Sequence, residues 1–63
     1  MKLNDKALQE VKAKIKSDGY MKAAIVSGMA INTLQNIRRE KDLSAKTVER
    51  VAKYLKKKVS SVI

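Results

Sequence analysis

Three amides and one guanidinium lie at helical spacing in the stretch from Ile31 to Glu40. These side chains belong to Asn32, Gln35, Asn36 and Arg39. At about 100° per residue they fall on one side of a helix, opposite Leu34 and Ile37. Amides pair bidentately with adenine and arginine pairs with guanine, whereas a solvated helix face more often mixes Lys with Glu. We therefore predict that a helix over roughly 31–40 reads base edges in the major groove of DNA.

Ile31 flanks this polar face at the start of the predicted helix. Its side chain either contacts a thymine methyl group or packs internally, and the spacing favours neither alternative. The predicted base-reading set is Ile31, Asn32, Gln35, Asn36 and Arg39.

The inventory of reactive side chains excludes the common kinds of catalysis. The 63 residues include no His and no Cys, so the chain lacks the usual acid–base catalyst and any thiolate zinc site. Its six acidic residues are scattered, and no glycine-rich phosphate loop is present. We expect a protein that is not an enzyme and that holds no cofactor or metal.

The charge balance points to a polyanionic partner. Lys and Arg number 15 against six Asp and Glu, for a formal charge of +9, and such a field attracts polyanions, which are nucleic acid, acidic lipid or an acidic protein. Gly19 and Gly28 interrupt the long amphipathic helix that a membrane-surface peptide needs. RNA and single-strand binders usually stack bases on aromatic side chains, and only Tyr20 and Tyr54 are present. Double-stranded DNA is the expected partner.

Capping signals and apolar periodicity predict the elements that position the polar face. The first helix is expected from about Asn4, its N-cap, to Ser17, and Asp18-Gly19 supplies the stop. Two short helices over 20–27 and 31–40 follow. No stretch alternates apolar and polar residues with period two, so no sheet is expected.

The fourth predicted helix has the clearest start, with Ser44 as its N-cap. An apolar stripe runs from Val48 to Val59, and Lys56–Lys58 is expected in the last turn, where cations complement the helix dipole. A truncated fifth helix is expected in the tail with Ser60 as its cap. The predicted fold is a compact all-α bundle of four to five helices in one domain, residues 1–63.

The connection between the second and third helices has the pattern of a helix-turn-helix. Ala24 is small enough for close helix packing, and Gly28, four positions later, tolerates a positive φ. Met29 then provides an apolar plug, and Leu34 and Ile37 anchor the following helix.

With these positions in place, the sequence resembles the Cro/repressor-type (XRE) helix-turn-helix family, the lambda-repressor-like fold. The Ala24…Gly28-Met29…Leu34…Ile37 core, the stretch Thr33–Arg39, the fourth helix Leu43–Leu55 and the tail Val59–Ile63 carry the resemblance. It implies a sequence-specific transcriptional repressor of a phage or mobile element that binds a near-palindromic operator as a dimer. The family's base-reading positions fall on Ala30, Ile31, Asn32, Gln35, Asn36 and Arg39.

The chain departs from the family pattern in its second helix. Tyr20 stands where the family often has Gln, although its hydroxyl can still donate to a phosphate. Ser27 replaces a large aliphatic residue, and Ile25 and Val26 occupy positions that are normally polar. Either the helix is rotated so that Val26 fills the core, or Ile25 is exposed and belongs to a protein contact.

Charge and geometry also suggest which residues contact the DNA backbone. The predicted phosphate contacts are Tyr20, Lys22, Arg38, Lys41, Ser44 and Lys46. The remaining lysines, Lys12, Lys14, Lys16 and Lys56–Lys58, are expected to be solvated. The apolar tail suggests a dimer interface that includes Val59, Val62 and Ile63.

The sequence allows two alternative functions and also bears on the location of the protein. The chain could instead be a helix-turn-helix-shaped protein-interaction module, which Ile25, Val62 and Ile63 favour, or a non-specific nucleic-acid binder. The polar start, Met1–Asp5, has no signal-peptide pattern, and no apolar run approaches membrane-spanning length. The bacterial cytoplasm or nucleoid is therefore the expected location.

Overall fold

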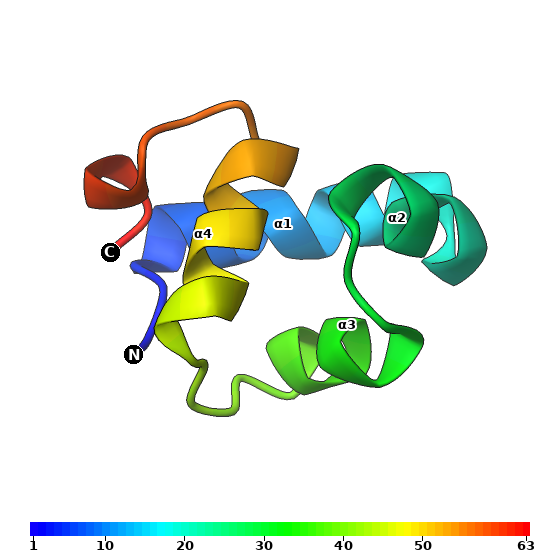
Figure 1. Cartoon of the computed structure of the whole chain (residues 1–63), viewed down its shortest axis with the longest axis horizontal. Coiled ribbons are helices and arrows are strands. Elements are labelled where there is room, and N and C mark those ends of the chain that lie inside the picture. The colour runs from blue at the N-terminus through cyan, green and yellow to red at the C-terminus, as the bar shows by residue number, and fades with distance from the viewer.

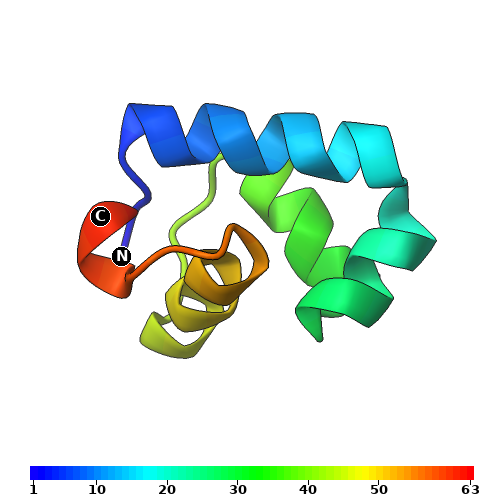
Figure 2. The same ribbon diagram turned by 90° about the horizontal axis from the view of Figure 1, so that it is seen from above.

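The computed structural model describes the whole chain, Met1–Ile63, as an all-α protein without strands. Its elements are α1 (Asp5–Asp18), α2 (Tyr20–Ser27), α3 (Ile31–Arg38), α4 (Ala45–Tyr54) and one 3-10 turn, η1 (Val59–Ser61). In both views α2 lies at the C-terminal end of α1, and the two chain termini lie near its N-terminal end (Figures 1 and 2). The predicted all-α class is confirmed, with four α-helices. None of them has the length and apolar character that crossing a bilayer requires.

Both predicted N-caps are present. The Asn4 side chain accepts a hydrogen bond from the backbone N–H of Ala7 at 2.7 Å. The Ser44 hydroxyl accepts one from the N–H of Thr47 at 3.2 Å. Each cap satisfies a donor that the first helical turn leaves without an intrahelical partner, which is why these helices begin where the sequence predicts.

A single apolar core joins the helices. It contains thirteen buried residues, among them Val11 and Ile15 of α1, Leu34 and Ile37 of α3, and Val48, Val51 and Ala52 of α4. These are stripes that the periodicity predicts. No buried side-chain polar atom lacks a hydrogen-bond partner.

Two helices end earlier than the sequence predicts, for one shared reason. After α3, Glu40 takes a left-handed conformation with φ 58°, and after α4, Lys56 does so with φ 57°. The next N–H groups turn back, from Lys41 to the Asn36 carbonyl and from Lys57 to the Ala52 carbonyl. This is the Schellman arrangement, which usually places Gly at the left-handed position.

The ends of α3 and α4 and the form of the tail correct three predictions. The third helix stops at Arg38 rather than Glu40, so Arg39 is its C-cap residue. Lys56–Lys58 forms the link after α4 instead of its last turn. The tail forms only the 3-10 turn Val59–Ser61, which begins at Val59 and has no cap from Ser60.

The tail also corrects the predicted dimer surface. The Val62 side chain is fully buried in the chain's own core. Its carbonyl accepts from the N–H of Asn4 at 2.8 Å, and the Asn4 amide donates to the Ser61 carbonyl at 3.1 Å. Val62 is therefore unavailable to a second subunit. Val59 is half-buried against the core, and only Ile63 is exposed.

Candidate nucleic-acid interface

The connection between α2 and α3 is three residues long and is fixed from both sides. Gly28 has φ 72° and ψ 17°, the left-handed conformation that its position requires. Met29 is buried, as predicted for the apolar plug. Nη1 of Arg50, on α4, donates to the Gly28 carbonyl. The turn is therefore held to α4 as well as to its own helices.

Ser27 has a local role in this turn. Its hydroxyl donates to the Ala23 carbonyl and accepts from the backbone N–H of Met29 at 3.2 Å. A hydroxyl thus bridges the end of α2 and the connection, at a position where the family resemblance favours an aliphatic side chain.

The orientation of α2 decides between the two alternatives for its apolar residues. Ala23 is fully buried and Ala24 is half-buried, so small side chains make the close packing. Val26 is 59% exposed and Ile25 is 80% exposed. The rotated arrangement, with Val26 filling the core, is therefore wrong, and Ile25 is exposed.

The predicted base-reading residues lie on the side of α3 opposite its core contacts. Leu34 and Ile37 are buried, whereas Asn32 and Arg39 are exposed. Gln35 and Asn36 are half-buried, and Ile31 is 42% exposed, which excludes full internal packing for it.

The polar groups on this face have no partner within the chain. The side-chain amides of Asn32, Gln35 and Asn36 form no hydrogen bond within the chain. Arg39 takes part in none of the four ion pairs. The face therefore presents hydrogen-bonding groups that an external ligand can occupy without breaking an existing contact.

A shallow hollow of about 290 Å³ lies beside the C-terminal half of α3. It is lined by Tyr20, Gln35, Arg38 and Arg39. Nη1 of Arg38 donates to the Tyr20 hydroxyl at 2.9 Å, and its guanidinium carbon lies 5.8 Å from the Tyr20 ring centre. Two predicted phosphate contacts and two predicted base-reading residues thus meet at one place.

A second hollow, about 170 Å³, lies between the starts of α3 and α4. Its lining residues are Met29, Thr33, Ser44, Lys46, Thr47 and Arg50. Ser44 and Lys46 are predicted phosphate contacts, whereas Thr33, Thr47 and Arg50 were not predicted. Lys46 and Arg50 are four residues apart on one helix and therefore share a face. This spacing is the sequence signal that could have identified Arg50 as a further phosphate contact.

The other two predicted phosphate contacts lie outside both hollows. Lys22 is exposed and lies 3.9 Å from an Asp18 carboxylate oxygen, so part of its charge is balanced. Lys41 is exposed in the loop between α3 and α4 and does not line either hollow.

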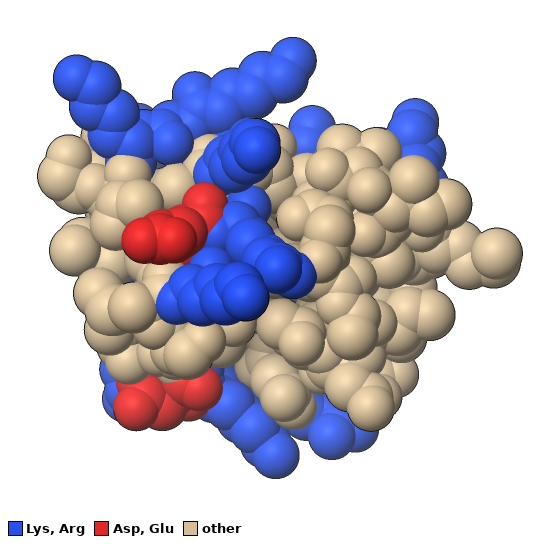
Figure 3. Space-filling model, in the orientation of Figure 1, with Lys and Arg blue, Asp and Glu red and all other residues tan.

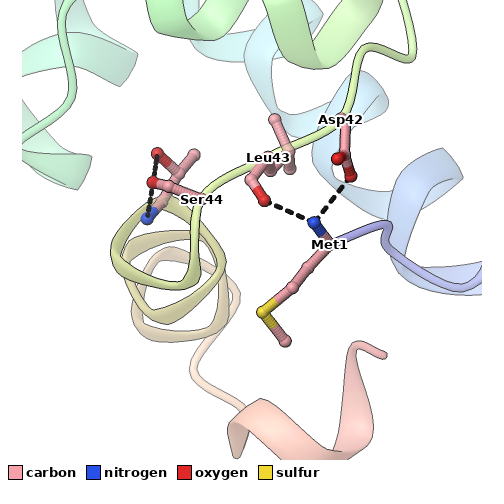
Figure 4. A network of polar contacts seen from close by, with 5 residues as sticks. Met1, Asp42, Leu43 and Ser44 are labelled. Atoms are coloured by element: carbon pink, nitrogen blue, oxygen red, sulfur yellow. Dashed lines mark hydrogen bonds and ion pairs between the residues drawn. The ribbon is translucent and has the colours of Figure 1, made fainter.

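The loop that carries Lys41 is fastened to the start of the chain. The Met1 ammonium group donates to Asp42 and to the Leu43 carbonyl, each at 2.6 Å (Figure 4). The Leu43 N–H returns a bond to the Met1 carbonyl at 2.7 Å. The hydrogen bond from the ammonium group lowers the pKa of the Asp42 carboxyl below its ordinary value. These contacts hold the loop at the two residues that precede Ser44, the N-cap of α4.

Acidic groups are absent from the segment that builds this face. No Asp or Glu occurs between Asp18 and Glu40, which spans α2, the turn and α3. Four of the six acids take part in ion pairs. In Figure 3 the acidic side chains lie on the left of the visible surface, and Lys and Arg project from its upper edge, centre and lower edge. A polyanion therefore approaches α3 without facing an acid from its own helix.

Comparisons of the chain with models of protein families, with curated proteins and with solved structures find no match.

Proposed function

We propose that the chain is a sequence-specific binder of double-stranded DNA that acts as a small helix-turn-helix repressor, with α3 in the major groove. The observation that carries this proposal is the outer face of α3. Three amides without internal partners and an unpaired arginine lie opposite two buried anchors, Leu34 and Ile37. Amides and guanidinium groups read adenine and guanine bidentately.

The two hollows support this orientation. The major groove is about 12 Å wide and is bordered by a phosphate chain on each side. One hollow offers Arg38 and the Tyr20 hydroxyl beside one end of α3. The other offers Lys46, Arg50 and the capped start of α4 beside the opposite end. A helix seated in the groove then has cationic and N–H donors toward both borders.

The resemblance to Cro/repressor-type proteins extends the proposal. The DNA site is then a near-palindromic operator, occupied by two copies of the chain in the bacterial cytoplasm or nucleoid. Val62 is buried in the chain's own core and therefore does not contribute to the contact between those copies.

Fluorescence anisotropy on two labelled duplexes tests the proposal. One duplex carries DNA from upstream of the protein's own coding sequence, the other a scrambled version, each at about 50 and 200 mM salt. We expect tighter binding to the upstream duplex at both salt concentrations. Gln35→Ala should reduce this preference, whereas Gln9→Ala, an exposed glutamine on α1, should preserve it.

The other outcomes each have a meaning. Equal and salt-sensitive binding to both duplexes, unchanged by Gln35→Ala, would indicate a non-specific nucleic-acid binder. Absence of binding at the lower salt concentration would refute the proposal and favour a helix-turn-helix-shaped protein-interaction module.

A further inference from the structure

The outer surface of α2 carries an apolar patch that the fold does not use. Met21 is 75% exposed, Ile25 80% and Val26 59%, so three of the six exposed large apolar side chains lie on this short helix. Met21 and Ile25 are four residues apart and therefore neighbours on the helix surface. In Figure 3 the surface over α2, on the right, is formed mostly by uncharged residues. Contiguous exposed apolar surface of this kind marks a contact site.

The α2 patch lies on a different side of the helix from Tyr20, the predicted phosphate contact beside α3. Tyr20 lines the hollow beside α3, and at about 100° per residue Ile25 lies roughly 140° around α2 from it. Hydrocarbon side chains gain nothing from contact with phosphates. We therefore expect Ile25 to remain accessible when α3 occupies the groove.

The size of the patch argues against a stable dimer in free solution. A stable interface covers about 800 Å² of each partner, nearly a fifth of this chain's 4243 Å² surface. Three side chains cover less than that, and two free copies each carry a formal charge of +9. Bound DNA removes both obstacles, because phosphates neutralise the charge and neighbouring sites hold the copies at an effective concentration of about millimolar.

The charges beside the patch fit a second copy of the chain. Lys22 and Asp18 lie 3.9 Å apart at its edge. In a two-fold contact each copy meets the same surface of the other, so the exposed Lys22 of each copy lies near a Lys22–Asp18 pair whose charges are balanced. An acid-rich partner would instead find this lysine already paired with Asp18.

We propose that the α2 patch, formed by Met21, Ile25 and Val26, is the contact between two copies bound at neighbouring positions on one DNA. The proposal rests on the DNA binding proposed above. The contact makes binding cooperative and leaves the affinity of a single copy unchanged.

Two unrelated duplexes test this without knowledge of the operator. One duplex has about 12 base pairs, which is close to the one-turn spacing of half-sites and leaves room for a single copy only. The other duplex is about five times longer and can hold several copies. We expect wild type to bind the long duplex cooperatively. Wild type should half-saturate this duplex at a protein concentration about tenfold lower than Ile25→Gln requires, which is a typical size for the coupling between two binding events. Both proteins should bind the short duplex equally. Gln9→Ala, which alters an exposed residue of α1 outside the patch, should behave as wild type.

The outcomes separate the two proposals. Equal cooperativity in wild type, Ile25→Gln and a second variant, Met21→Gln, would overturn the patch contact while leaving DNA binding intact; the patch would then serve a different protein. A loss of affinity on the short duplex would overturn it as well, because the patch would then act in DNA binding or folding. Absence of wild-type binding to either duplex at about 50 mM salt would refute both proposals. A DNA-free dimer in sedimentation that Ile25→Gln abolishes would overturn the requirement for DNA.

Discussion

Tyr54→Phe removes one hydroxyl that joins the end of α4 to the end of α1. The Tyr54 hydroxyl donates to an Asp18 carboxylate oxygen at 2.7 Å, and the side chain is almost wholly buried. The Lys14 ammonium lies 5.1 Å from the centre of the same ring. The substitution keeps the ring, so it isolates the hydrogen bond.

The structure sets the size of the effect near neutral pH. A hydrogen bond to a charged acceptor contributes more than a neutral one, but Asp18 keeps Lys22 at 3.9 Å and some contact with water. We therefore expect a loss of about 1–2 kcal/mol in the free energy of unfolding. In a chain of 63 residues, that corresponds to a fall of roughly 8–15 °C in Tm.

The pH dependence has a definite sign. Burial, together with the hydrogen bond to Asp18, raises the pKa of Tyr54 from its ordinary value of 10.0 to about 12. Between these values the unfolded chain releases the phenolic proton while the folded chain retains it. The stabilisation is thus fully present below pH 10 and is lost as the pH rises to about 12. A pKa change of this size corresponds to about 3 kcal/mol.

Urea unfolding followed by circular dichroism, from pH 7 to 12, measures both effects. The difference between wild type and Tyr54→Phe is the quantity of interest, because it cancels pH effects that both proteins share. We expect wild type to be more stable up to pH 10 and to lose its advantage before pH 12, because the pKa change corresponds to more free energy than the hydrogen bond contributes. A difference that stays constant over this range would refute the assigned hydrogen bond and the cause given for the raised pKa.

Three further predictions address the interface and the tail. Arg39→Ala should cost roughly 1–3 kcal/mol on the true operator and relax its base preference, and Arg39→Lys should retain the charge but not the preference; equal losses on all sequences would exclude base reading. Lys41→Ala should weaken binding uniformly and reduce the slope of log affinity against log salt by about one, with Lys58→Ala as the exposed control; undiminished binding would remove Lys41 from the interface. Val62→Ala should lower the free energy of unfolding by about 1–3 kcal/mol in urea titrations, because it removes fully buried methyl groups, and should leave the sedimentation of the protein unchanged; a stable variant with altered self-association would contradict its role in the core.

The sequence alone determined the features that depend on neighbouring residues. Asn4 and Ser44 each accept a hydrogen bond from an N–H three residues later, so the starts of α1 and α4 were predictable. Gly28 takes the left-handed conformation that its place between two helices indicated. The polar face of α3 was predictable for the same reason, because helical periodicity relates its members and the buried Leu34 and Ile37 fix the opposite side.

Only the tertiary structure decided features that depend on atoms distant along the chain. Glu40 and Lys56 adopt left-handed conformations although neither is Gly, and no local signal marks them as helix ends. Arg50 reaches the Gly28 carbonyl across 22 positions. Val62 is buried because η1 packs at the start of α1, where its carbonyl meets Asn4.

The exposure of α2 also required the packed structure. Ala23, Ala24, Ile25 and Val26 are consecutive apolar residues, so periodicity alone does not select which of them faces the core. Packing against α1, α3 and α4 favours the smallest side chain at the closest approach, and Ala23 takes that position. The larger Ile25 and Val26 are consequently directed to the surface, since the remaining core volume is already filled by its neighbours.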